Sequence, residues 1–132
     1  MVVHARRKAK GSAFERELVH LFWKNGWGST RIAGSGSIHQ PAPDLIAGRP
    51  GRFLAIEAKT SSNAAKYLTI EEVDDLISFA TAIGAEPWIA VKFKGNGIWF
   101  CAASSANRTE RSVIVSLGNP SLFTFSELIN EQ

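Results

Sequence analysis

The chain has 132 residues, 45% of them hydrophobic and 20% charged, a balance typical of one folded domain rather than a disordered or fibrous chain. A chain of this length buries about two-thirds of its surface on folding, which is enough for a stable core without disulfides or structural metals. Cys101 is the only cysteine, and the sequence shows no signal-peptide pattern, so we expect a cytoplasmic protein without disulfides. No apolar run approaches the roughly 18 residues that span a bilayer, which argues against a transmembrane role.

The charge is mildly positive, with fifteen Lys and Arg against twelve Asp and Glu and a net charge of +3. This excess permits an anionic partner without requiring one. We expect a single domain over residues 1–132, in which residues 1–11 form a basic, flexible N-terminal arm. The arm carries Arg6, Arg7, Lys8 and Lys10. A basic arm of this kind is typical of proteins that contact phosphates. A solvated tail without a function is an equally good interpretation.

The first expected element is a helix. Ser12 and Glu15 have the spacing of a capping box, and Asn25-Gly26 supplies a left-handed stop, which together predict a helix between these points. At 100° per residue its apolar side chains share one arc. They are Phe14, Leu18, Val19, Leu21 and Phe22. Glu15 falls inside this arc, so its carboxylate is expected to point inward.

A short strand, a loop and a hairpin are expected next. Residues 28–32 indicate a strand, and the turn formers of residues 33–43 indicate a loop. The apolar runs 45–47 and 53–59 flank the turn-forming residues 48–51, a pattern that predicts a β-hairpin.

The remaining elements give the fold class. Thr69 and Glu72 form a second capping box, and the helical period then continues to Gly84. Beyond it we expect a hairpin of strands 88–93 and 98–102, then a strand at 113–115 and a short helix at 125–129. The element order predicts an α/β protein with a mixed central β-sheet flanked by helices.

The predicted hairpin brings acidic residues together. Asp44 precedes its first strand and Glu57 lies thirteen positions later in its second, so the two carboxylates are expected nearly opposite each other. A divalent cation relieves their repulsion, and Mg²⁺ or Mn²⁺ suits such oxygen ligands. The period of two places Lys59 on the same face as Glu57, where it can orient water or stabilise charge on a phosphate. Glu15 is a plausible further acid.

Each of these residues also has an ordinary structural explanation. Glu57 and Lys59 can form a solvated ion pair, Asp44 can end a turn, and Glu15 can complete a helix cap. The convergence of three acids and a lysine on one hairpin, beside a basic arm, favours a catalytic site.

These residues carry a family resemblance. Pro43-Asp44 followed by Glu57-Ala58-Lys59 resembles the PD-(D/E)XK nuclease signature. With the segments 11–18 and 31–37, and with Tyr67-Leu68 and the helix up to Gly84, the chain resembles archaeal-type Holliday junction resolvases of the Hjc group over about residues 7–103. Residues after about 104 resemble that group less.

The resemblance implies a restriction-endonuclease-like fold and a homodimeric, Mg²⁺-dependent endonuclease of DNA recombination and repair that cuts paired strands of four-way junctions. Mn²⁺ can replace Mg²⁺. The implied catalytic residues are Glu15, Ser35, Asp44, Glu57 and Lys59. The implied metal ligands are Glu15, Asp44, Glu57 and the backbone carbonyl of Ala58. The implied DNA-binding residues are Arg6, Arg7, Lys8, Lys10, Arg31, Ser35 and Ser37.

Other polar and aromatic residues have ordinary explanations. His39 can shuttle a proton but is more often merely solvated in such a loop. Acids at the start of the second helix are explained by capping and the helix dipole. They are Glu71, Glu72, Asp74 and Asp75. The tryptophans at positions 23, 27, 88 and 99 can stack on bases, but three of them lie in apolar helix or strand patterns, which favours the core or a dimer interface.

Two other functions stay open. A nuclease of the same chemistry can act on a flap, a nicked duplex or a specific duplex site, although no recognition helix or zinc finger is evident for reading bases. A non-catalytic dimer that binds or bridges DNA junctions is the second, and the intact set of two acids and a lysine argues against it.

Overall fold

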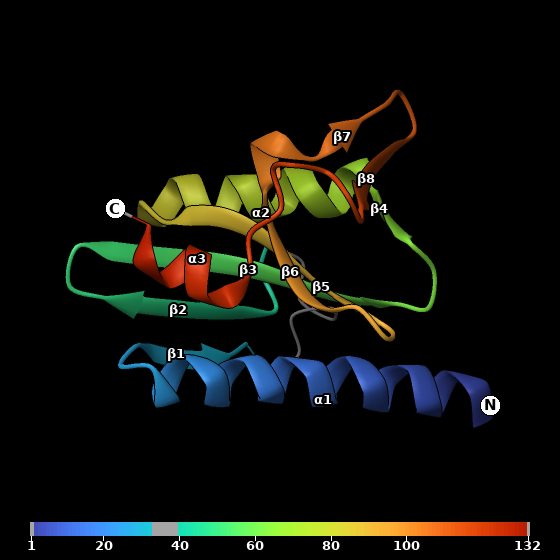
Figure 1. Ribbon diagram of the computed structural model, residues 1–132. Helices are drawn as coiled ribbons and strands as arrows, with labels where there is room; N and C mark the ends of the chain where they lie inside the picture. Colours follow the sequence, from blue (N-terminus) through green and yellow to red (C-terminus); the bar gives the residue numbers. More distant parts are fainter. Residues whose placement is uncertain (1, 33–39, 132) are drawn as a thin grey trace.

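The structure is a computed structural model that describes residues 2–32 and 40–131, with side chains described from residue 11 onward (Figure 1). The helices are α1 (Val2–Lys24), α2 (Ile70–Ile83) and α3 (Phe125–Asn130), with a short 3-10 helix at Ala103–Ser105. The strands are β1 (Gly28–Arg31), β2 (Leu45–Arg49), β3 (Arg52–Ser61), β4 (Ala65–Thr69), β5 (Glu86–Phe93), β6 (Gly97–Ala102), β7 (Asn107–Arg108) and β8 (Ser112–Ser116).

The main sheet is mixed and has the strand order β1-β2-β3-β5-β6. Among the described strands of this sheet, β3 and β5 form the one parallel pair, and α2 lies in the connection between them, as a parallel pair requires a crossover. The β2–β3 hairpin turns at Pro50-Gly51, where Gly51 has a φ of 90° that favours glycine. The α/β class, the mixed sheet and both expected hairpins are therefore confirmed.

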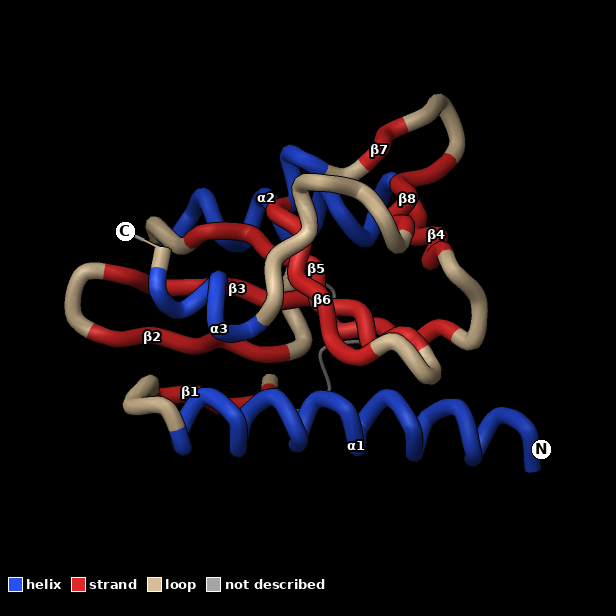
Figure 2. The backbone as a smooth tube through the Cα atoms, in the orientation of Figure 1, coloured by secondary structure: helices blue, strands red, loops and turns tan. Residues whose placement is uncertain are grey.

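The sheet separates two layers of packing (Figure 2). On one face Leu54 and Ile56 of β3 pack with α1 and α3. On the other face Ala55 packs with α2 and β8. This alternation confirms the expected period of two along β3, and it places Glu57 and Lys59 on the side of the sheet covered by α2.

The start of the first helix differs from its expected position. Helix α1 begins at Val2, so Ser12 lies inside the helix and is not its N-cap. The residues before Ser12 are rich in Ala, Arg and Lys, which favour helix, and they extend it beyond the apparent cap. The basic residues expected in a separate arm therefore lie in the first turns of a helix. The expected end of the helix at Asn25-Gly26 is confirmed, since Gly26 has a φ of 83°.

A second sheet was not expected. Its order is β4-β8-β7, and it pairs Ala65 with Ser116 across a long stretch of sequence. The strand at 113–115 and the helix at 125–129 are confirmed within β8 and α3. Strands β4 and β7 were not expected; β7 has two residues, and β4 has one buried residue, Leu68. Among the described residues, no helix is long and apolar enough to cross a membrane.

Candidate active site

The β2–β3 hairpin places Asp44 beside Glu57. Leu45 pairs with Ile56, so the next position toward the open end of the hairpin brings Asp44 opposite Glu57. Asp44 Oδ2 accepts a hydrogen bond of 2.9 Å from the Ala58 backbone N–H. Because β2 begins only at Leu45, this N–H bonds to a side chain instead of a strand. The expected opposition of the two acids is therefore confirmed, and Asp44 is fixed by the backbone of β3.

Glu57 is a largely buried carboxylic acid, with 14% of its side chain exposed. Burial, followed by the negative charge of Asp44, raises the pKa of Glu57 to about 8, although Lys59 acts in the opposite direction. Asp44 and Glu57 therefore do not ionise readily at the same time. A bound cation would stabilise both charged forms, so this position favours cation binding.

Lys59 lies between two carboxylates. Its Nζ is 2.7 Å from Glu72 Oε1 and 3.7 Å from Glu57 Oε2. Burial by itself lowers the pKa of Lys59, but the hydrogen bond to Glu72 and the charges of Glu72, Glu57 and Asp44 outweigh it, and the pKa is raised overall. Lys59 is therefore a cation and a proton donor at neutral pH, suited to stabilising negative charge rather than to acting as a base.

Glu15 reaches the same region from α1. Its side chain is 17% exposed, and its Oε1 accepts a hydrogen bond of 3.0 Å from Arg31 Nε on β1. Burial and then the charge of Asp44 raise the pKa of Glu15, and Arg31 partly offsets them. The inward direction expected for Glu15 is thus confirmed. Its expected capping role is wrong, because the helix begins well before it.

Glu72 was not expected in the site. Its interpretation as a capping residue is confirmed, since Thr69 and Glu72 form both bonds of a capping box. The contact with Lys59 adds a second role that the sequence pattern did not indicate. Helix α2 follows β3 only after the β4 segment, so no short-range spacing connects the two residues.

Several expected site residues lie outside the described part of the structure. Ser35, Ser37 and His39 fall in the segment 33–39, and the side chains of Arg6, Arg7, Lys8 and Lys10 precede residue 11. Their expected roles stay predictions. Arg31 is described, and it contacts Glu15.

The tryptophans take different places. Trp27 and Trp88 are buried, which confirms their expected place in the core. Trp99 is partly buried against the cluster on the α2 face. Trp23 is 62% exposed and donates from its ring to Ser29 O, so it does not lie in the core, and a place at a dimer interface stays a prediction.

The donor set suits a hard divalent cation. Among the described side chains, no group of three or more His, Cys, Asp or Glu converges tightly enough to be a preformed metal centre. Glu15 is engaged by Arg31 in this arrangement. The adjacent carboxylates of Asp44 and Glu57 nevertheless present hard oxygen donors. Burial and then the charge of Asp44 raise the pKa of Glu57, and a bound cation opposes both effects.

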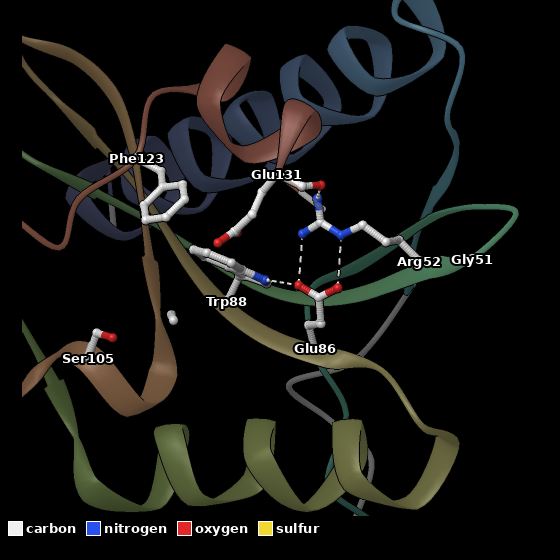
Figure 3. Close-up of a pocket in the computed structure, with 8 residues that line it drawn as sticks. Gly51, Arg52, Glu86, Trp88, Ser105, Phe123 and Glu131 are labelled. Atoms are coloured by element: carbon white, nitrogen blue, oxygen red, sulfur yellow. Dashed lines mark hydrogen bonds and ion pairs between the residues drawn. The ribbon is translucent and has the colours of Figure 1, made fainter.

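A separate pocket of about 490 Å³ is lined by residues that do not belong to this cluster (Figure 3). Within it Arg52 donates to both carboxylate oxygens of Glu86, at 2.9 and 2.8 Å, and to Leu128 O at 2.6 Å. Trp88 Nε1 also donates to Glu86, at 3.0 Å. These polar groups bind one another and attach α3 to the sheet, which indicates a structural role.

A mixed sheet with two acids and a lysine on one hairpin is the arrangement of the PD-(D/E)XK nucleases. The family model described as archaeal Holliday junction resolvase (Hjc) matches residues 6–131. The chain belongs to this family of archaeal Holliday junction resolvases. The match extends well beyond residue 104, where the sequence motifs indicated less similarity.

Known relatives agree with this assignment. The crossover junction endodeoxyribonuclease Hjc of Archaeoglobus fulgidus is 39% identical over 105 residues, which cover 80% of this chain and 77% of the relative. The protein of the same name from Methanocaldococcus jannaschii is 46% identical over 86 residues, covering 65% and 61%. The solved structure of Archaeoglobus fulgidus Hjc, a Holliday junction resolvase, matches with a TM-score of 0.84 and 34% identity over 89% of this chain and 98% of that one.

Proposed function

We propose that this chain is a structure-specific endodeoxyribonuclease that resolves four-way DNA junctions by Mg²⁺-dependent hydrolysis of phosphodiester bonds. The observation that carries the proposal is the cluster of Asp44, Glu57 and Lys59 at the open end of one hairpin, in a member of the archaeal Holliday junction resolvase family. The names of the relatives support the junction substrate. We also propose that the protein acts in the cytoplasm.

The metal ligands in this proposal are Asp44, Glu57 and the backbone carbonyl of Ala58, with Glu15 acting directly or through water. Mn²⁺ is expected to replace Mg²⁺. When bound, the cation supplies a water of lowered pKa and offsets charge on the phosphate. Glu15 Oε1 now lies 3.0 Å from Arg31 Nε. To contribute to this set, Glu15 has to break this ion pair or bind through its other carboxylate oxygen.

Lys59 donates hydrogen bonds in this mechanism. The raised pKa of Lys59 keeps it protonated, so it can hold the attacking water or a non-bridging phosphate oxygen and stabilise the charge that develops there. The Asp44 carboxylate is held by the Ala58 N–H, so little reorganisation is needed at that ligand when DNA arrives.

A homodimer completes the proposal. One chain carries a single set of these residues, and resolution of a junction requires symmetric cuts in two strands, so two copies related by a two-fold axis are the economical solution. We assign phosphate contacts to Arg6, Arg7, Lys8, Lys10, Arg31, Ser35 and Ser37.

The decisive experiment compares a synthetic four-way junction with a linear duplex of the same arm sequence, each with and without Mg²⁺. We expect paired, symmetric cuts in the junction only when Mg²⁺ is present, with Asp44→Asn protein as the inactive control. Equal cutting of the linear duplex would overturn the junction specificity, and the same comparison with flapped and nicked duplexes tests the alternative substrates. Tight junction binding without any cutting would favour the non-catalytic dimer.

A further inference from the structure

The Glu72 carboxylate uses its two oxygens for two different partners. Oε2 accepts a hydrogen bond of 2.9 Å from the Thr69 backbone N–H, which is half of the capping box of α2. Oε1 accepts a hydrogen bond of 2.7 Å from Lys59 Nζ. One side chain therefore connects the start of a helix to the lysine of the candidate active site.

The capping box holds Glu72 in one orientation. The Thr69 hydroxyl accepts from the Glu72 backbone N–H at 3.0 Å, so the residue is bonded through its backbone and its side chain. The start of α2 is itself anchored, because its own side chains Val73 and Leu76 are buried in the core. The oxygen that faces Lys59 is consequently part of a rigid element rather than of a loop.

Lys59 depends on such a partner more than the acids do. Its charge lies at the end of a flexible four-carbon stem with a large rotamer entropy, whereas Asp44 is fixed by a backbone N–H. A second carboxylate within ion-pair distance of Lys59 Nζ is that of Glu57, whose Oε2 lies 3.7 Å away. Without the Glu72 contact, Nζ is expected to move toward Glu57, which is itself an expected metal ligand.

Helix α3 offers an internal comparison. It has the same capping box, in which Glu127 Oε1 accepts from the Thr124 N–H at 2.8 Å. Within the described part of the chain, no Lys or Arg forms an ion pair with Glu127. A capping glutamate thus needs no lysine, and the Lys59 contact of Glu72 is additional to capping.

We infer that Glu72 is a positioning residue for cleavage, which holds the Lys59 ammonium in the direction of the scissile phosphate and away from Glu57. The first turn of α2 is thereby part of the active site. The inference rests on the proposed nuclease function, because it assigns Glu72 a role only through Lys59.

The test compares Glu72→Gln with Glu127→Gln in single-turnover cleavage of a four-way junction at saturating protein. In the structure Thr69 and Lys59 donate to different oxygens of Glu72, and glutamine replaces one of these oxygens with an NH₂ donor, so it cannot keep both hydrogen bonds in this geometry. We expect Glu72→Gln to lower the cleavage rate about 10- to 100-fold, the usual effect of removing a residue that orients a catalytic group. Junction affinity in EDTA should stay unchanged, and Glu127→Gln should cleave like the wild type.

A second measurement shows whether the contact acts in solution. Unfolding of the metal-free protein is followed for Glu72→Gln, Lys59→Met and the double variant. The destabilisation caused by Glu72→Gln should be smaller in the Lys59→Met background, because the partner is already absent. Additive effects, or a normal cleavage rate for Glu72→Gln, would overturn the inference. Failure of the wild-type chain to cut junctions would instead overturn the proposed function.

Discussion

The Ala58 backbone N–H donates to the Asp44 carboxylate at 2.9 Å, across the point where strand pairing of the β2–β3 hairpin ends. The hydrogen bond fixes one acid next to another that is largely buried, Glu57. The backbone therefore keeps two carboxylates close together although their charges repel. Burial and then this repulsion raise the pKa of Glu57 to about 8.

Substitution of the three central residues should separate catalysis from folding. We expect Asp44→Asn, Glu57→Gln and Lys59→Ala each to abolish junction cleavage. Asparagine retains an oxygen that can accept from Ala58, and Glu57→Gln removes a repulsion, so both variants should remain folded. Gel assays of cleavage and circular dichroism spectra of each variant check this. Cleavage by the wild type in EDTA would contradict the cation requirement.

The raised pKa of Glu57 predicts a pH-dependent stability of the metal-free protein. Between the ordinary value of 4.5 and about 8, the folded chain holds a proton that the unfolded chain has released. The free energy of unfolding should therefore fall as the pH rises through this window. Glu57→Gln should remove most of the fall, the rest coming from Glu15, whose pKa is raised as well. The variant should gain a few kcal/mol at pH 8, since one pKa unit corresponds to about 1.4 kcal/mol.

Urea unfolding of the metal-free protein at pH 5 and pH 8 measures this effect. Glu110→Gln is the matched control, because Glu110 is exposed and its substitution should not change the free energy of unfolding at either pH. Addition of Mg²⁺ at pH 8 should restore stability to the wild type and not to Glu57→Gln. A wild-type stability that rises between pH 5 and pH 8 would contradict the assignment.

The hairpin was predictable because its information is local. Four turn-forming residues and a period of two place Asp44 near Glu57 and put Lys59 on the same face. The contact of Lys59 with Glu72 was not predictable, because it depends on how α2 packs over the sheet after β4. The second sheet was missed for a similar reason, since Ala65 pairs with the distant Ser116.

The start of α1 shows a limit of pattern reading. Ser12 and Glu15 match a capping box, but the preceding residues favour helix strongly enough that the box lies inside α1. Glu15 therefore does not cap α1. Its burial near Asp44 is the better indication of its role in the candidate active site.

Glu15→Gln should consequently lower cleavage without a loss of stability. Glutamine keeps the shape of the side chain and removes the charge that a cation or its bound water requires, and the expected decrease in rate is about 10- to 100-fold. Glu17→Gln is the matched control, because Glu17 lies on the same helix and pairs with Lys92 at 2.7 Å. Cleavage rates and melting temperatures are compared. A folded and fully active Glu15→Gln protein would exclude Glu15 from catalysis.

The basic N-terminal residues should govern the salt dependence of junction binding. Replacement of Arg6, Arg7, Lys8 and Lys10 by Gln is expected to flatten the slope of log affinity against log salt by up to roughly 0.9 for each phosphate that the variant no longer neutralises. Fluorescence anisotropy in EDTA at several salt concentrations measures the slope. An unchanged slope would show that these residues do not contact DNA.

The homodimer and the glycine-serine segment can be tested together. Residues 34–37 are Gly-Ser-Gly-Ser, whose hydroxyls and amides can reach phosphate oxygens of a branched backbone. We expect sedimentation at micromolar concentration to give twice the mass of the chain, because symmetric cuts require two active sites. Ser35→Ala should reduce the cleavage rate more than it reduces junction affinity, and it should leave the dimer intact. A monomer both on and off junction DNA would refute the paired-site proposal, whereas an unimpaired Ser35→Ala enzyme would remove only this serine from the mechanism.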